Sequence, residues 1–212
     1  MVRLFCIFCV RIFAKLFYRH KVYGKENIPP GGGIIAPNHC SFLDPMLVGI
    51  SCPDEIHFLA RETLFHYPFF AWLIRKLNTH PVRKGAGNID TLKMALELVV
   101  QGRKKVVIFP EGKRSVDGQL HKGQLGVGML VQRARCLIIP VYVHGTFEAW
   151  SAQRKFPKLR GKTACIFGKP ILYEERLSED KKEAQGEIVN KMMAKITDLR
   201  IWYLKGAHGS PP

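Results

Sequence analysis

Two side chains suited to proton transfer, His39 and Asp44, lie five positions apart in the first quarter of the sequence. Imidazole titrates near neutral pH, so a histidine can take a proton from a hydroxyl group. A carboxylate on the other ring nitrogen fixes the tautomer and stabilises the imidazolium that forms. On a regular helix five residues turn about 500°, which leaves the two side chains about 140° apart. The pair therefore requires a bend. The sequence favours one here, because a Gly-rich turn and a short apolar strand (residues 31–37) precede the pair and Pro45 opens a helical segment after it.

A second polar stretch follows a strand of the buried type. Residues 106–109 are apolar, and the five residues from 111 to 115 carry a carboxylate, two cations and a hydroxyl. In α/β proteins, ligands bind at the carboxyl ends of the strands. Gly112 allows close backbone approach, and an arginine can hold a phosphate through two parallel hydrogen bonds. The stretch therefore predicts an anion-binding turn made of Glu111, Gly112, Lys113, Arg114 and Ser115.

The two stretches, in this order, resemble the glycerolipid acyltransferase family, whose marks are an N-H-x4-D block and a downstream F-P-E-G-x-R-S block. Both blocks are matched at every defining position, at residues 38–44 and 109–115. Two weaker blocks, at residues 79–84 and 137–143, also resemble the family, so the resemblance covers about residues 30–145. It is closest to the branch that acylates 1-acyl-glycerol-3-phosphate (lysophosphatidic acid) to phosphatidic acid. The resemblance implies an O-acyltransferase.

The resemblance also implies how such a site works. His39 takes the proton from the acceptor hydroxyl, Asp44 orients His39, and the oxygen attacks the carbonyl carbon of an acyl thioester directly. Backbone amides near His39 or around the turn at residues 109–112 are expected to stabilise the oxyanion. The residues expected to bind the acceptor phosphate are Arg83, Glu111, Gly112, Lys113, Arg114 and Ser115, with Lys84 in support.

The expected co-substrate is acyl-CoA or acyl carrier protein, and the sequence does not distinguish these two thioesters. No metal and no bound cofactor is expected. Another lysophospholipid or glycerol phosphate is an alternative acceptor. A different mechanism would form an acyl-enzyme on Cys40 or Ser41, but the sequence shows no third partner that would activate either nucleophile.

Charge is the outlying property of the composition, because 33 Lys and Arg against 17 Asp and Glu give +16 over 212 residues. Such a balance indicates an anionic partner, either nucleic acid or an anionic membrane surface. Nucleic-acid binding would not account for the two motif blocks or for the apolar N-terminus. We therefore expect the partner to be an anionic membrane surface and not nucleic acid. Cys6 and Cys9 lack a second ligand pair for zinc, and the six cysteines are expected to be reduced thiols.

The N-terminal segment (residues 1–20) predicts an amphipathic helix at a membrane interface. Its longest uncharged run is residues 4–10, whereas a spanning helix needs about 20 apolar residues. At about 100° per residue, four cations fall in one sector of about 160°, and most of the remaining surface is apolar. The expected membrane-contacting residues are Arg3, Arg11, Lys15 and Arg19. A terminal helix packed on the core is the alternative. We expect a peripheral or monotopic protein at the cytoplasmic face of a membrane.

The rest of the chain predicts one α/β domain over residues 21–205. About seven strand-like segments alternate with helical ones, which favours a mostly parallel (mixed) sheet covered by helices on both faces. Residues 64–74 are apolar and aromatic, which fits a buried core helix, a second membrane-dipping element or a wall of the acyl-chain site. Residues 154–162 are basic and contain no acidic residue, which fits a solvated loop or a headgroup contact. The tail, residues 206–212, is expected to be disordered.

Overall fold

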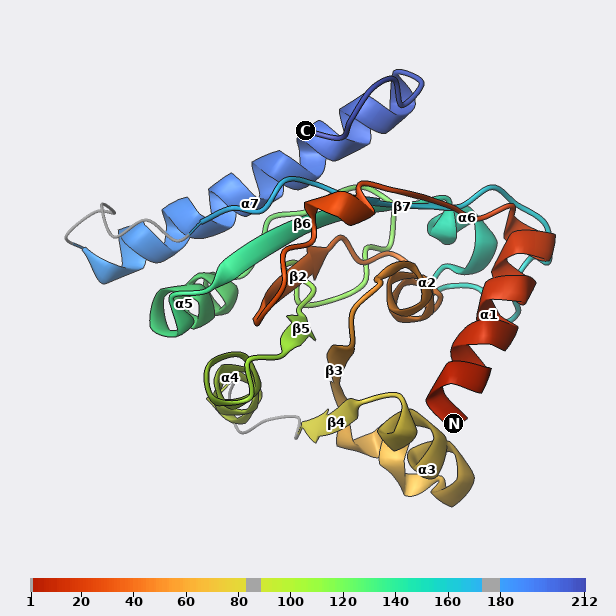
Figure 1. The fold of residues 1–212 in the computed structure, drawn as a ribbon, viewed down its shortest axis with the longest axis horizontal. Coiled ribbons are helices and arrows are strands. Elements are labelled where there is room, and N and C mark those ends of the chain that lie inside the picture. Colours follow the sequence, from red (N-terminus) through yellow and green to blue (C-terminus); the bar gives the residue numbers. More distant parts are fainter. Residues whose placement is uncertain (1, 83–88, 173–179) are drawn as a thin grey trace.

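The computed structural model of the protein describes residues 2–82, 89–172 and 180–212. The strands are β1 (Lys21–Tyr23), β2 (Gly33–Pro37), β3 (Ile56–Arg61), β4 (Thr79–Val82), β5 (Lys105–Val107), β6 (Leu137–His144) and β7 (Ala164–Phe167). Within the described ranges they form one seven-stranded sheet in the order β1-β7-β6-β2-β5-β3-β4 (Figure 1). Neighbouring strands are parallel except β6 and β7. The predicted single α/β domain with a mostly parallel sheet is confirmed.

Helices cover both faces of this sheet. They are α1 (Val2–Tyr18), α2 (Asp44–Ser51), α3 (Pro68–Lys76), α4 (Ile89–Leu96), α5 (Leu125–Ala134), α6 (Thr146–Trp150) and α7 (Lys181–Leu204). The helices α4, α5 and α7 pack on one face, whereas α1 and α2 lie on the other, and α3 lies beside the edge strand β4 (Figure 1). Short 3₁₀ turns occupy Lys25–Asn27 and Glu62–His66, and a π-helical turn, Glu97–Gln101, continues α4.

The central strands are buried on both faces, which explains their continuous apolar runs. Ile34 and Val106 pack in the core under α4, α5 and α7, whereas their neighbours Ile35 and Val107 pack in the core under α2. Successive side chains of a strand point to opposite faces, so each dipeptide contributes to both layers. This double burial fixes β2 and β5 side by side, and the segments that follow them lie at the same edge of the sheet.

The inner side of α1 is part of the core. Ala14 and Tyr18 are buried together with residues of α2, and Arg11 Nε donates to the carbonyl of Ile50 at the end of α2 at 2.9 Å. Arg3 is half-buried. One side of α1 therefore packs against α2, and Arg11 joins this contact through its hydrogen bond although its side chain is exposed. That Arg3, Arg11, Lys15 and Arg19 contact a membrane remains a prediction.

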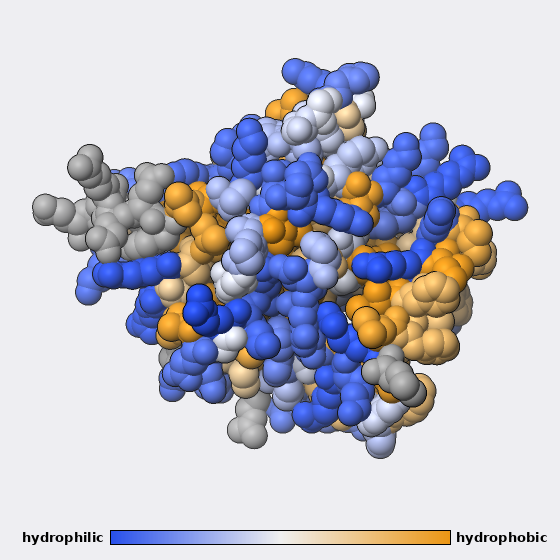
Figure 2. Space-filling view, viewed as in Figure 1, coloured by the Kyte–Doolittle hydropathy of each residue, from blue (hydrophilic) through white to orange (hydrophobic). Residues whose placement is uncertain are grey.

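The outer side of α1 remains exposed and mixes apolar side chains with cations. The exposed apolar residues are Leu4, Phe5, Phe8, Ile12 and Leu16, and the exposed cations beside them are Arg11, Lys15 and Arg19. Figure 2 shows hydrophobic side chains gathered over α1 and continuing toward α3. None of the helices in the described ranges combines the length and the hydropathy that a membrane span requires.

Residues 64–74 form two elements, because Pro68 restricts the residue before it. Tyr67 is extended, with φ −95° and ψ 108°, and separates the 3₁₀ turn from α3. Ala71 is buried, whereas Tyr67, Phe69 and Trp72 are exposed. The alternative of a fully buried helix is therefore wrong for this segment.

The C-terminal tail also differs from the expected disorder. The indole of Trp202 donates to the carbonyl of His208 at 2.9 Å, and the amide of Lys169 donates to the carbonyl of Pro212 at 3.0 Å. Gly206, with φ 102°, allows the chain to turn back after α7. Composition indicated a flexible end, but one local hydrogen bond and one that joins residues 43 positions apart hold the tail against the domain.

Candidate active site

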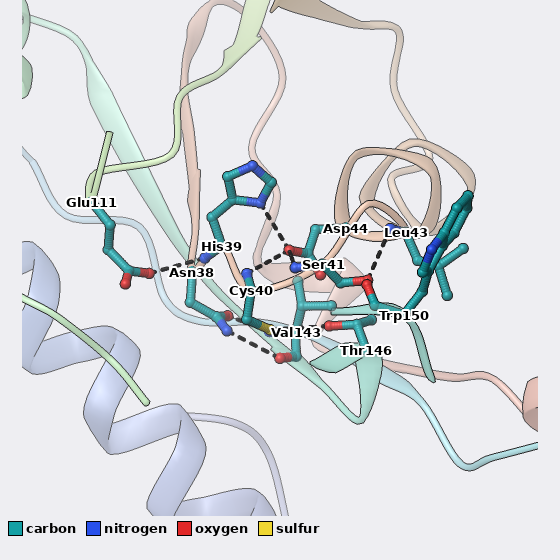
Figure 3. A network of polar contacts seen from close by, with 10 residues as sticks. All are labelled: Asn38, His39, Cys40, Ser41, Leu43, Asp44, Glu111, Val143, Thr146 and Trp150. Carbon is teal, nitrogen blue, oxygen red and sulfur yellow. Dashed lines mark hydrogen bonds and ion pairs between the residues drawn. The ribbon is translucent and has the colours of Figure 1, made fainter. Parts of the chain in front are cut away.

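The bend between β2 and α2 brings His39 and Asp44 into contact. Nδ1 of His39 lies 2.8 Å from Oδ2 of Asp44, whose side chain has no exposed surface, while the His39 side chain is 17% exposed (Figure 3). The same carboxylate oxygen accepts hydrogen bonds from the amides of Cys40 and Ser41, each at 2.7 Å. Asp44 thus both stabilises the bend and orients the imidazole, and the predicted contact between His39 and Asp44 is present.

The orientation of His39 leaves its other ring nitrogen, Nε2, free to act. Figure 3 shows this nitrogen pointing away from the hydrogen-bonded network. Phe109 stacks on the imidazole, with the ring centroids 3.9 Å apart and an interplanar angle of 23°. Because Asp44 accepts from Nδ1–H, the tautomer that it favours carries the basic lone pair on Nε2. The geometry is that of a general base.

Asn38 and Ser41 fasten this bend to the rest of the domain. The side chain of Asn38 donates to the carbonyl of Val143 at 3.2 Å and accepts from the Val143 amide at 2.7 Å. Ser41 Oγ donates to the carbonyl of Trp150 at 2.7 Å and accepts from the Leu43 amide at 3.0 Å. The sequence interpretation gave Asn38 no role, although its place in the first block was the signal. It anchors the bend to β6.

Glu111 connects the two motif blocks through backbone amides. Its Oε1 accepts from the His39 amide at 2.9 Å, and its Oε2 accepts from the His121 amide at 3.1 Å. Only 3% of Glu111 is exposed, and this burial raises the pKa of its carboxyl group. The Ser115 amide in turn donates to the His39 carbonyl at 2.7 Å. A buried carboxylate occupied in this way holds His39 in place and does not point toward an acceptor phosphate.

The predicted anion-binding turn divides into residues that shape it and residues that can reach a ligand. Gly112 has φ 70°, a left-handed conformation that favours glycine, and its amide donates to the Phe109 carbonyl at 3.0 Å. Ser115 is buried, and its hydroxyl donates to Asp117 at 2.7 Å. Lys113 is exposed and Arg114 is partly exposed. Lys113 and Arg114 are therefore the two cations of the turn that are available to an anion.

Arg114 is held by an aromatic ring from the first block. Its guanidinium carbon lies 3.8 Å from the centroid of the Phe42 ring, and Phe42 in turn packs at 5.1 Å against Trp150. Burial lowers the pKa of Arg114, and the nearby charge of Arg61 acts in the same direction. Arg61 ends β3 at the same sheet edge, and the sequence interpretation missed it because it belongs to neither block. The only signal was its position after an apolar strand.

Arg83 and Lys84, the other cations expected at the acceptor phosphate, lie outside the described residues. The weaker block that contains them begins on β4, which is parallel to β3, so the carboxyl ends of both strands lie at the edge that carries Arg61.

The acyl-enzyme alternative does not fit this geometry. Burial raises the pKa of the Cys40 thiol to about 12, and its sulfur lies 3.2 Å from Thr146 Oγ1. Ser41 has no exposed surface, and its hydroxyl is occupied by the Trp150 carbonyl. A thiol that stays protonated and a buried, hydrogen-bonded hydroxyl are poor nucleophiles. Both side chains stabilise the bend.

The fold and the site together define an α/β enzyme with a histidine–aspartate pair beside a cationic turn. Residues 19–144 match the family model described as Acyltransferase, which is more than half of the chain. The chain belongs to this acyltransferase family, and it is an O-acyltransferase as the two motif blocks predicted.

Individual relatives agree with the family. The chain is 27% identical to the 1-acyl-sn-glycerol-3-phosphate acyltransferase of Bacillus subtilis, covering 92% of this chain and 95% of that protein. It is 31% identical to the enzyme of the same name from Saccharomyces cerevisiae, over 84% of this chain and 58% of the yeast protein. The chain therefore spans little more than half of this longer relative. The crystal structure of the 1-acyl-sn-glycerophosphate (LPA) acyltransferase PlsC from Thermotoga maritima superposes with a TM-score of 0.73 at 26% identity, covering 92% of this chain and 79% of that one.

Proposed function

We propose that the protein transfers a fatty acyl group from a thioester to the free hydroxyl of 1-acyl-glycerol-3-phosphate, which gives phosphatidic acid for phospholipid biosynthesis. The observation that carries the proposal is the His39–Asp44 pair at 2.8 Å beside a guanidinium, Arg114, that an aromatic ring holds at the same edge of the sheet. The base acts on a hydroxyl, and the cation selects an acceptor that bears a phosphate. The names of the relatives support this choice of acceptor.

The reaction follows from the free Nε2 of His39. This nitrogen takes the proton of the acceptor hydroxyl while the oxygen forms a bond to the thioester carbonyl carbon. Asp44 stabilises the imidazolium that results. When the tetrahedral intermediate collapses, the carbon–sulfur bond breaks, and the leaving thiolate takes the proton back from His39. No metal and no bound cofactor is needed, since the thioester is a co-substrate.

The oxyanion of the intermediate needs donors that are not already used. The amides of His39, Cys40 and Ser41 donate to carboxylates, and the Gly112 amide closes the turn on Phe109. These amides were among those expected to stabilise the oxyanion, and their hydrogen bonds remove them from that role. We assign the role to the amides of Lys113 and Arg114, which follow Gly112 in the same turn.

The acceptor phosphate binds between the cations at the sheet edge. Arg114 offers a planar fork for two phosphate oxygens, and Lys113 adds a mobile charge. Arg61 adds a cation from the end of β3. Arg83, which lies outside the described residues, remains an expected ligand from the sequence. The donor is acyl-CoA or acyl carrier protein, and both carry anionic groups that suit this basic surface.

The protein works at the cytoplasmic face of a membrane as a peripheral or monotopic protein, because its acceptor and its product are lipids of the bilayer. The exposed side of α1 supports this location, since Leu4, Phe8 and Leu16 are open to solvent beside Lys15 and Arg19. Such a mixture suits an interfacial helix whose other side packs on the domain.

An acceptor panel tests the proposed function. The turnover of three acceptors, lysophosphatidic acid, glycerol 3-phosphate and lysophosphatidylcholine, is measured first with acyl-CoA and then with acyl-acyl carrier protein as the donor. We expect the highest kcat/KM for lysophosphatidic acid, and a kcat of the His39→Ala variant that is roughly 10²- to 10⁴-fold lower with every acceptor. A preference for glycerol 3-phosphate or lysophosphatidylcholine would show that the acceptor is wrong, whereas wild-type turnover by His39→Ala would show that the base is wrong.

A further inference from the structure

The segment between α6 and β7, residues 151–162, concentrates positive charge at the surface, and we refer to it as the basic loop. It contains no acidic residue, and its five cations are all exposed: Arg154, Lys155, Lys158, Arg160 and Lys162. It also exposes two large apolar side chains, Phe156 at 69% and Leu159 at 51%. Large apolar side chains exposed among cations are the combination of groups typical of segments that lie at a membrane interface.

The basic loop is fastened at one end to the catalytic bend. The Trp150 carbonyl, immediately before the loop, accepts from the Phe42 amide at 3.3 Å and from Ser41 Oγ at 2.7 Å. The Trp150 indole donates to the Arg154 carbonyl at 3.1 Å, and the Lys158 amide donates to the Ala149 carbonyl at 2.8 Å. These bonds give the loop a defined path next to the block that carries His39.

The other end of the loop is fastened to α1. The Gly161 amide donates to the Phe17 carbonyl at 3.2 Å, and the Thr163 amide donates to the Tyr18 carbonyl at 2.9 Å. In Figure 1 the chain between α6 and β7 runs beside the C-terminal end of α1. The basic loop thus continues the exposed side of α1, where Leu16 and Lys15 show the same combination of apolar and cationic groups.

We propose that the basic loop is a second membrane-binding element, which inserts Phe156 and Leu159 at the headgroup level of an anionic bilayer while its cations contact lipid phosphates. Charge complementarity and continuity with the exposed side of α1 favour a bilayer over an acidic protein as its occupant. The inference rests on the proposed function, in which the acceptor is a bilayer lipid. Because the loop is bonded to the catalytic bend as well as to α1, docking of the two elements sets the active site at the membrane surface.

The charge of the loop is tested by vesicle cosedimentation of the full chain. The variant Lys155→Gln/Lys158→Gln is compared with Lys181→Gln/Lys182→Gln, which removes the same charge at the start of α7. The vesicles contain phosphatidylcholine with or without phosphatidylglycerol. We expect the loop variant to lose at least roughly tenfold in partitioning to the anionic vesicles at low salt, with the difference shrinking at high salt. The α7 variant should bind like the wild type.

The apolar groups are tested in the same assay with Phe156→Ser/Leu159→Ser. The matched control is Val100→Ser/Leu204→Ser, two exposed apolar side chains on helices of the other sheet face. We expect the loop variant to lose roughly tenfold in partitioning at low and at high salt alike, because burial of apolar area is not screened. Both loop side chains are exposed, so the thermal midpoint should stay at the wild-type value.

Activity separates the possible outcomes. On a short-chain, soluble lysophosphatidate with acyl-CoA, both loop variants should turn over like the wild type, while on vesicle-embedded acceptor they should be slower. Wild-type partitioning of both loop variants would overturn the proposal. If these variants also lost activity with acyl-acyl carrier protein but kept it with acyl-CoA, the loop would instead bind the protein donor. A wild-type protein without turnover of any lysophosphatidate would instead disprove the proposed function, while the cosedimentation result would still decide the role of the loop.

Discussion

The catalytic bend buries its polar groups, whereas the outer surface formed by α1 and the basic loop exposes apolar side chains together with cations. In the bend, polar groups are buried in a hydrogen-bonded network in which Oδ2 of Asp44 accepts three hydrogen bonds, while its Oδ1 has no partner among the described residues. On the outer surface, Phe8, Leu16 and Phe156 face solvent next to exposed cations. A preorganised site needs fixed dipoles, whereas a membrane-binding surface needs apolar area that is free until the bilayer covers it. The same domain meets both needs because backbone carbonyls make the connections: Trp150 joins the loop to the bend, and Phe17 and Tyr18 join α1 to the loop, so the outer side chains stay exposed.

The largest effect should come from breaking the catalytic pair. The variant His39→Ala should lose roughly 10²- to 10⁴-fold in kcat, which is the range for loss of a general base. The variant Asp44→Asn should lose a similar or smaller factor, since an amide neither favours the right tautomer nor stabilises the imidazolium. Steady-state kinetics on soluble acceptor measure both changes, and circular dichroism verifies the fold. Wild-type rates in folded His39→Ala would rule out the mechanism.

A second histidine sharpens the comparison, because His20 has the opposite environment to His39. It lies just after α1, where its ring nitrogens contact Thr163 Oγ1 at 2.9 Å and Ser51 Oγ at 2.8 Å. It lacks the carboxylate that His39 has, and burial lowers its pKa from 6.5 to about 4, with the charge of Lys25 as a smaller cause. His20 is therefore neutral in the folded protein across the range in which an unfolded chain would protonate it.

The stability of the protein should depend on His20 in mild acid. Because the folded pKa lies below the unfolded one, this contribution to stability is complete above about pH 6.5, falls as the pH falls and levels off below about pH 4. The full loss is about 3 kcal/mol in the free energy of unfolding. Urea denaturation of wild type and His20→Gln between these pH values should show a shallower dependence in the variant. Parallel pH profiles would contradict the assignment, and comparing the two proteins removes the effects of other buried histidines.

The sequence revealed the parts of the molecule that depend on local pattern. Apolar, strand-like segments that alternate with helical segments predicted the sheet. The positions of His39 and Asp44 between a strand and Pro45 predicted the bend that brings these two side chains together. The direction in which a side chain points could not be predicted from the sequence in the same way. Glu111 belongs to a recognisable motif, yet spacing does not reveal that both of its oxygens face backbone amides 72 and 10 positions away. For the same reason, the place of Arg11 in the cationic sector did not reveal its hydrogen bond to the Ile50 carbonyl.

Removing a carboxylate oxygen of Glu111 should have an effect on kcat of intermediate size. The variant Glu111→Gln replaces one acceptor oxygen by an NH₂ group, which cannot accept from the His39 or His121 amide. Leaving a buried donor unsatisfied costs about 1–3 kcal/mol, so the free energy of unfolding should drop by this amount. A displaced His39 should lower kcat by roughly tenfold, while the acceptor KM should stay near the wild-type value. If acceptor KM rose alone, with stability unchanged, Glu111 would be a substrate ligand after all.

The smallest expected effect concerns the ring that carries Arg114. A cation–π contact at a partly exposed site contributes about 0.5–2 kcal/mol, so Phe42→Leu should raise the acceptor KM by roughly 2- to 30-fold and leave kcat nearly unchanged. The variant Phe42→Tyr keeps the ring and should restore the wild-type KM. Replacing Arg114 with lysine should raise the acceptor KM as well, because lysine keeps the charge but loses the planar fork.

A matched control exists on the basic loop, where Lys155 lies 5.5 Å from the ring of Phe156. The variant Phe156→Leu removes a similar contact, but it should not change the KM for a soluble acceptor, because this ring is not part of the phosphate site. The thermal midpoint of Phe42→Leu shows whether lost packing on Trp150 adds to the effect. A rise in donor KM without a change in acceptor KM would mean that Arg114 binds the phosphates of the thioester donor. In that case the acceptor phosphate would depend on the other cations at this sheet edge, Arg61 and Lys113.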